Sequence, residues 1–173
     1  MSISAFKAQF DGGVRATSYE VTINFPAAVV AGTAARKATY LAKGAQLPDD
    51  TVNLVDVYFQ GRQVKVAGDR TFTDLTITFY LDKEFALRDA FERWMGLLNG
   101  HNSNLGIANP NLYKADIFVT VKDRDGRSLK TYRYVGCIPN NIATIDLGYD
   151  QTDTILEFPV TFGYDYWETE TTK

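Results

Sequence analysis

The sequence is poor in the side chains that carry most protein chemistry. Its 173 residues include one histidine, His101, and one cysteine, Cys137. A single cysteine excludes an intramolecular disulfide and a multi-cysteine zinc site, and it fits synthesis in a reducing cytoplasm. We therefore expect no cofactor and no metal, and we interpret Cys137 as a buried side chain rather than a nucleophile.

An excess of positive charge and long apolar runs are missing too. The chain has 18 Lys and Arg against 21 Asp and Glu, a formal net charge of -3 at pH 7. Proteins that grip nucleic acid cluster basic residues to neutralise phosphates, whereas the basic residues here are dispersed. No apolar run approaches the roughly 20 residues of a membrane-spanning helix, so we expect no membrane anchor.

The sequence motifs of common enzymes are also absent. There is no G-x-S-x-G nucleophile elbow, no phosphate loop and no dinucleotide fingerprint. His101 stands among Asn102, Ser103 and Asn104, which favours a solvated loop residue over a general base or a metal ligand. We therefore expect no enzymatic activity. A small β-barrel enzyme or ligand-binding module stays an alternative, and a deep pocket with His101 or clustered carboxylates would favour it.

What the sequence does have is a regular alternation of apolar and polar residues. It is clearest at 19–25 and 75–81, where every second residue is apolar, as a strand with one buried face requires. A turn at Asp125-Gly126 predicts a hairpin, and a second corner is expected at Gly68-Asp69-Arg70. Further extended segments are expected at 37–44, 52–61, 62–68, 117–123, 129–139, 143–150 and 154–168.

One segment changes to helical spacing. From Asp82, the predicted N-cap, apolar residues recur at Leu87, Phe91 and Trp94, and Gly100 follows the end. One helix between two strand-rich halves predicts a mainly β protein. We expect a β-sandwich or partly open barrel of about seven strands with one flanking α-helix.

Several stretches resemble the tail tube proteins of contractile-tailed (T4-like) bacteriophages. The most specific are AGDRTF at 67–72 and DYWE at 165–168. Four further stretches resemble that family, and they occur in the same order along the chain: YEVTINF, KATYLAKGAQLP, FALRDAFERWMGLLN and GCIPNNI. The resemblance covers 19–168.

The resemblance implies a structural virion protein with the phage tail tube fold. Its hexameric rings would stack helically into the inner tube inside a contractile sheath, forming the conduit for DNA ejection. The implied partners are further copies of itself, the sheath protein, baseplate and tail-terminator proteins, and a tape-measure protein in the lumen, while phage DNA passes without specific binding. The implied location is the virion tail, after assembly in the host bacterial cytoplasm. A baseplate tube-initiator or the tube of a phage-derived contractile injection system stays open as an alternative.

The same resemblance predicts how the chain is divided into a domain, a projecting loop and two ends. We expect a single tail-tube domain over 1–173 with its core at 18–168. The segment 43–62 resembles the family's projecting inter-ring loop. The ends, 1–17 and 169–173, are expected to be flexible or to lie in interfaces.

Two sets of residues are predicted to function in the assembly. Asp69 and Arg70 are expected to form an ion pair, either within a subunit or across a ring interface. The hypothesised inter-subunit contacts are Gly44, Gln46, Leu47, Pro48, Asp50, Val52, Asn53, Asp69 and Arg70. The lumen is expected to be polar to acidic, and its candidate lining residues, from the non-core faces of the strongest strands, are Thr76, Thr78, Glu157 and Thr161.

Overall fold

The computed structural model describes residues 2–10 and 12–172. Met1, Asp11 and Lys173, which belong to the ends expected to be flexible or in interfaces, lie outside the described residues. In chain order the elements are α1 (Ile3–Phe10), β1 (Tyr19–Ile23), α2 (Ala34–Leu41), β2 (Ala42–Ala45), β3 (Thr51–Phe59), β4 (Arg62–Thr71), β5 (Leu75–Tyr80), α3 (Ala86–Leu98), α4 (Pro110–Tyr113), β6 (Ala115–Lys122), β7 (Ser128–Ile142), β8 (Glu157–Gly163) and β9 (Tyr166–Glu168).

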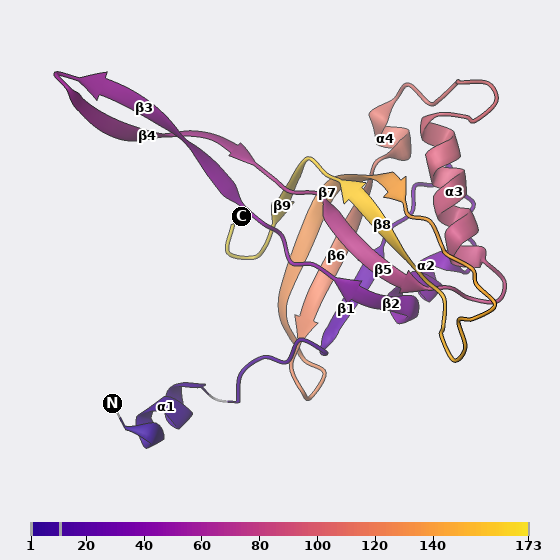
Figure 1. The fold of residues 1–173 in the computed structure, drawn as a ribbon, viewed down its shortest axis with the longest axis horizontal. Coiled ribbons are helices and arrows are strands. Elements are labelled where there is room, and N and C mark those ends of the chain that lie inside the picture. Colours follow the sequence, from indigo (N-terminus) through magenta and orange to yellow (C-terminus); the bar gives the residue numbers. More distant parts are fainter. Residues whose placement is uncertain (1, 11, 173) are drawn as a thin grey trace.

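Seven strands form one open antiparallel sheet in the order β1-β6-β7-β8-β5-β2, with β9 paired to β7. The edge strands β1 and β2 approach each other where the Tyr19 hydroxyl donates a hydrogen bond to the Ala42 carbonyl oxygen at 3.2 Å. The sheet therefore curves toward a barrel without closing (Figure 1). This confirms the predicted mainly β, partly open architecture.

Strand β7 runs through both halves of the sheet. It spans 15 residues, pairing with β6 and β9 in its first part and with β8 in its second. Gly136 interrupts it at a bulge opposite Asp116, with φ 70°, and a Cβ there would lie 2.3 Å from an Asp165 carboxylate oxygen. Only glycine fits this position without strain.

The core lies between the sheet and α3, with α2 beside them. Alternate residues of β5 and β8 point into it, and one face of α3 covers them. Phe91 of α3 lies against four aromatic rings at centroid distances of 5.4 to 6.4 Å. The predicted helix face is thus confirmed. The buried residues of these three elements are Leu75, Ile77, Phe79, Leu87, Ala90, Phe91, Trp94, Phe158, Val160 and Phe162.

The start of α3 differs from the prediction. Phe85, in the left-handed region at φ 53°, occupies the N-cap position, so the assignment of Asp82 as N-cap is wrong. The Asp82 carboxylate still accepts a hydrogen bond from the Ala86 N–H at 3.3 Å. It also forms an ion pair with Lys37 at 2.7 Å. Burial raises the pKa of Asp82, but these hydrogen bonds and that of the Leu87 N–H outweigh it, so the pKa lies below its ordinary value.

Two segments predicted as strands are not strands. The segment 37–44 contains most of α2, because Ala34 and Ala38, four residues apart, are both buried against the body, and only its end enters β2. The segment 143–150 is a loop in which Leu147 and Tyr149 are exposed. Strand β7 instead continues through Pro139 to Ile142, with a register shift at Pro139 that tolerates the missing backbone donor.

The expected corner at Gly68 is also wrong. Strands β3 and β4 form a hairpin that turns at Gln60-Gly61, both with positive φ (47° and 81°), the pattern of a two-residue type I′ turn. Gly68 lies inside β4, where a Cβ would come within 3.0 Å of the Asn53 carbonyl oxygen. The missing side chain of Gly68 therefore lets β3 and β4 approach closely, and the residue does not form a turn. The predicted hairpin turn at Asp125-Gly126 between β6 and β7 is confirmed, with φ 81° at Gly126.

Candidate assembly interface

The β3–β4 hairpin projects far from the body of the molecule (Figure 1). All residues of β3 are exposed, as are all residues of β4 except the half-buried Gly68. A two-stranded hairpin without packing on either face is at best marginally stable in water. The strands of this hairpin are nine and ten residues long and are exposed on both faces. We therefore infer that the hairpin packs against a partner.

One face of this hairpin is apolar except at its tip, where Arg62 lies opposite Phe59. The register places Val55 opposite Val66 and Val57 opposite Val64, with Phe59 at the tip, and these five side chains are 48% to 68% exposed. We call this set, Val55, Val57, Phe59, Val64 and Val66, the valine face. Contiguous exposed apolar patches on soluble proteins mark interaction surfaces. The valine face is therefore the strongest candidate interface of the chain.

The opposite face of the hairpin is mixed. It presents Leu54 and Tyr58, and an ion pair between Lys65 Nζ and Asp56 Oδ1 at 3.2 Å. The alternation of Val55, Val57 and Phe59 is visible in the sequence, but period two does not show whether the apolar face packs inside the chain. The projecting segment expected at 43–62 contains Val55, Val57 and Phe59, but sequence reasoning did not name these side chains as contacts, and it left Val64 and Val66 outside the segment.

The nine residues predicted to contact neighbouring subunits gather at the root of the hairpin. Gly44 lies in β2, Gln46 to Pro48 lie in the following segment, and Asp50 precedes β3. Val52 and Asn53 lie in the first part of β3, and Asp69 and Arg70 lie near the end of β4. The Gln46 carbonyl oxygen accepts a hydrogen bond from the Tyr134 hydroxyl at 2.9 Å. These contacts attach the hairpin to the sheet. Contact with another subunit stays a prediction for all nine.

Arg70 has its ionic partner in its own chain. Its Nε lies 3.3 Å from Asp50 Oδ1, so the two strands of the hairpin are tied at the root. The ion pair joins Arg70 to Asp50, not to its neighbour Asp69 as the sequence suggested. A contact of Asp69 or Arg70 across a ring interface stays a prediction.

A cavity of about 350 Å³ lies beside this root, lined among others by Asp49, Asp74, Tyr134 and Tyr164. Asp49 accepts a hydrogen bond from the Thr73 hydroxyl at 3.1 Å, and Asp74 accepts one from the Asn140 amide at 2.6 Å. Burial raises the pKa of Tyr164 to about 12 and that of Tyr134 further. Both phenols stay protonated at neutral pH, so neither serves as a general base there.

The other candidates for chemistry lie in different surroundings. Cys137 is buried, as predicted, and burial raises the pKa of its thiol to about 12, so it is not a thiolate at neutral pH. His101 is exposed in the turn after α3. Among residues 2–10 and 12–172, no group of three or more His, Cys, Asp or Glu side chains is arranged to hold a metal ion.

The residues predicted to line the lumen share one face of the sheet, opposite the core. Thr76 lies directly across from Thr161, with their hydroxyl oxygens 3.3 Å apart, and Thr78 follows on the same face. Glu157 forms an ion pair with Lys43. The face is thus made of neutral hydroxyls and a matched charge pair. That it lines a channel stays a prediction.

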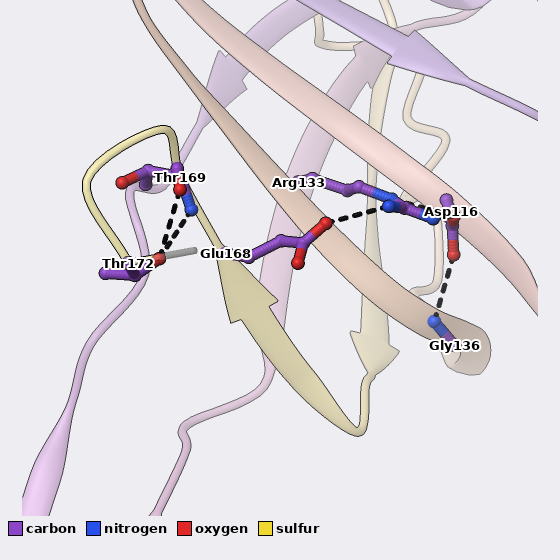
Figure 2. Close-up of polar contacts among 6 residues, drawn as sticks. All are labelled: Asp116, Arg133, Gly136, Glu168, Thr169 and Thr172. Carbon is purple, nitrogen blue, oxygen red and sulfur yellow. Dashed lines mark hydrogen bonds and ion pairs between the residues drawn. The ribbon is translucent and has the colours of Figure 1, made fainter.

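The C-terminal DYWE motif contributes Glu168 to an ion-pair network within the subunit. Figure 2 shows Arg133 of β7 between two carboxylates: its Nη2 donates to Asp116 at 2.7 Å and its Nη1 to Glu168 at 2.7 Å. The hydrogen bond to Asp116, then that to Glu168, raises the pKa of the Arg133 guanidinium. Asp116 also accepts the Gly136 N–H at 3.2 Å. This network fastens β9 to the sheet.

The N-terminal helix α1 is a second exposed apolar element. Ile3, Phe6 and Phe10 are 77%, 65% and 55% exposed, and the Phe6 and Phe10 rings stack at 5.4 Å. Sequence reasoning considered this end as a docking segment but missed its helical stripe. The signal was present, since positions i, i+3 and i+7 share one face of a helix.

Comparison with known proteins gives a consistent result. Residues 14–170 match the family model described as phage tail tube protein. The tail tube protein gp19 of Enterobacteria phage T4 is 33% identical over 131 residues, which cover 75% of this chain and 80% of that protein. The tail tube protein of Serratia phage KSP90 is 29% identical over 154 residues, covering 88% of this chain and 87% of that protein.

Solved structures share the fold at low sequence identity. A chain of the sheath–tube complex of an extracellular contractile injection system superposes with a TM-score of 0.64 at 15% identity, covering 98% of both chains. A chain of the tube-terminating cap of the anti-feeding prophage gives a TM-score of 0.64 at 14% identity, covering 91% of this chain and 90% of that one. Within the described part of this chain, no helix is both long and apolar enough to cross a membrane.

Proposed function

This chain belongs to the phage tail tube protein family, and we propose that it forms hexameric rings that stack helically into the inner tube of a contractile phage tail. The observation that carries the proposal is the valine face, an exposed apolar surface on a hairpin that lacks a packing partner in the described chain. Neighbouring copies in a tube supply such a partner. The whole chain acts as one tail-tube domain, with the hairpin and both ends as contact elements.

Ring closure is supported by the open sheet. Strands β1 and β2 end the sheet, and each has one edge of backbone donors and acceptors without a strand in the sheet order. Exposed edges are a liability unless they are paired or covered. Lateral contact between copies around a ring removes them, as barrel closure does within one chain.

The polar face is proposed as the channel wall. Thr76, Thr78 and Thr161 offer hydroxyls, and Glu157 neutralises Lys43. A wall with few free cations does not hold phosphates through counterion release, so DNA can move along it without specific binding. A tape-measure protein occupies the same lumen before ejection.

The outer partners follow from proteins of the same fold. Solved structures with this fold come from a sheath–tube complex, a tube-terminating cap and a baseplate. For this chain we infer a sheath protein around the tube and baseplate and tail-terminator proteins at its ends. The protein thus resides in the virion tail after assembly in the host bacterial cytoplasm, without a membrane anchor. It acts as a structural element without catalysis or a cofactor.

Electron microscopy of the purified protein tests this proposal. The wild-type chain is expected to form stacked rings of uniform diameter. Val57→Thr with Val64→Thr keeps the side-chain shape and strand preference but places hydroxyls on the valine face, so tubes should be lost while the subunit stays folded. Val30→Thr, a matched change at another exposed valine (76% exposed), should leave tubes intact. Persistent monomers of the wild-type chain at high concentration would contradict the proposal.

A tube of a phage-derived injection particle, or a baseplate tube-initiator, is the second candidate. The fold shared with an extracellular contractile injection system supports it. The 33% identity to the tail tube protein of Enterobacteria phage T4 favours the phage tail instead. Sequencing the neighbouring genes separates the two, since capsid and terminase genes are expected beside a phage tail gene.

A further inference from the structure

Two exposed apolar surfaces of this chain lack a partner in the structure. One is the valine face of the β3–β4 hairpin. The other is the stripe of Ile3, Phe6 and Phe10 on α1, which we call the aromatic stripe, and its three side chains are 55% to 77% exposed. The side chains that define the two surfaces are all apolar, and one cation borders each surface: Arg62, opposite Phe59, and Lys7, four residues after Ile3. Both would lower their free energy by leaving water.

We propose that the aromatic stripe of one copy packs on the valine face of a second copy. This inference rests on the proposed stacking of copies into a tube and assigns a specific contact to it. It gives both surfaces a partner of matching chemistry, aromatic rings against branched aliphatic side chains.

The two surfaces match in size. From Ile3 to Phe10 a helix rises ~10 Å at about 1.5 Å per residue. From Val55 to Phe59 a strand extends ~13 Å at about 3.3 Å per residue. A helix with its side chains is roughly 10 Å wide, close to the width of two strands spaced about 4.8 Å apart. One short helix therefore covers the ladder formed by Val55, Val57, Val64 and Val66.

The positions of the two elements favour contact between copies. In Figure 1 the hairpin leaves the body toward the top and α1 lies at the bottom, on the same side of the molecule. When two unlike surfaces of identical chains meet, each copy offers one surface to the copy before it and the other to the copy after it. Such a heterologous contact repeats without closing, which suits a growing tube.

A groove on the same chain is the competing position for α1. A cavity of about 270 Å³ is lined by Val14, Tyr19, Leu47, Val119 and Val121, among others, beside the segment that leads from α1 to β1. If α1 folded back into this groove, the contact would form inside a monomer. A contact within one chain does not depend on protein concentration, whereas the proposed one does.

Paired cysteine variants test the contact directly. Copies with Phe6→Cys are mixed with copies that carry Val57→Cys, polymerised and oxidised mildly, and linked dimers are counted on a non-reducing gel. Native Cys137 gives little background, because its thiol is buried and burial raises its pKa to about 12. We expect a dimer of one Phe6→Cys and one Val57→Cys chain that appears only in assembled protein.

Matched controls lie on the far faces of the same elements. Ala8 is on the opposite side of α1 from the stripe, since a turn takes about 3.6 residues, and Gln63 is opposite Tyr58 on the other face of the hairpin. The pairs Ala8→Cys with Val57→Cys and Phe6→Cys with Gln63→Cys should lose the dimer. Phe6→Ala with Phe10→Ala should raise the concentration needed for tubes at least ~10-fold, equivalent to about 1.4 kcal/mol per subunit contact.

The possible results separate this inference from the proposed function. Wild-type tubes together with no Phe6→Cys to Val57→Cys dimer would overturn the inference and leave the tube intact. A monomer that cross-links within itself in a Phe6→Cys, Val121→Cys double variant, at any dilution, would also overturn it by placing α1 in its own groove. A wild-type chain that forms no tubes under any condition would overturn the proposed function itself.

Discussion

Phe91 in the body and Phe59 in the hairpin show how differently the two regions use the same kind of residue. Phe91 is fully buried and lies against four rings, whereas Phe59 is 68% exposed at the tip of the hairpin. Both belong to regular apolar patterns in their elements. The body completes its packing within one chain, whereas the hairpin residues are exposed, and we propose that neighbouring copies pack against them. Subunit stability and assembly should therefore respond to separate sets of residues.

The largest expected effect comes from truncating these two rings. Phe91→Ala should destabilise the subunit by about 3 to 5 kcal/mol, because it removes a large buried side chain and leaves a cavity. Phe59→Ala should change the free energy of unfolding by less than ~0.5 kcal/mol, as surface substitutions do. Urea unfolding of the unassembled subunit measures both. Similar losses at the two positions would mean that the hairpin packs within its own chain.

A smaller effect is expected where the hairpin strands approach most closely. Gly68→Ala places a Cβ about 3.0 Å from the Asn53 carbonyl oxygen and from a Val55 methyl, so it should destabilise the hairpin by ~1 to 2 kcal/mol. The loss should appear as faster hydrogen exchange in 51–71, with the exchange of the body unchanged. Gly44→Ala is the control, because no atom lies within 4 Å of its Cβ. Faster exchange throughout the body would show that the two regions unfold together.

The smallest effect concerns the start of α3 inside the body. Asp82→Asn should cost about 1 kcal/mol at neutral pH, because the neutral amide loses the charge-assisted hydrogen bond from Lys37 that the carboxylate accepts at 2.7 Å. The pKa of Asp82 is lowered from its ordinary value of 3.8, so this stability is present above about that pH and is lost as the pH falls through the folded-state pKa.

Thermal unfolding of both proteins across this pH range measures the difference, which should disappear in acid. Glu84→Gln is the control, since Glu84 contacts the same Lys37 from an exposed position (76%) and should show no measurable change. A pH-independent difference between wild type and Asp82→Asn would mean that the carboxylate charge does not matter.

The body could be predicted from the sequence because its burial is local to the chain. The alternation at 75–81 and the helical spacing of Leu87, Phe91 and Trp94 both report a face that packs inside the subunit. The turn at Asp125-Gly126 could also be predicted, because Asp-Gly between two strand patterns is typical of a hairpin turn. The structure gives Gly126 the positive φ that such a turn requires. Each of these signals reflects a constraint that one chain satisfies alone.

The hairpin and α2 were harder to predict for physical reasons. Gly61 and Gly68 look alike in the sequence, and only the register shows that the first makes the turn and the second a close contact. In α2 the buried face consists of Ala34 and Ala38, too small to signal helical periodicity beside Tyr40 and Leu41. The valine face was visible as alternation, but alternation alone does not show whether such a face packs inside the chain or stays exposed.

The single long strand β7 has a mechanical consequence. Because it pairs with β6 and β9 at one end and with β8 at the other, the two halves of the sheet share one covalent backbone. A force that slides one half past the other must stretch this backbone or break the hydrogen bonds of several strands together. The bulge at Gly136 is where such a strand can bend. Such a force is therefore carried by a covalent chain and not by hydrogen bonds between strands alone.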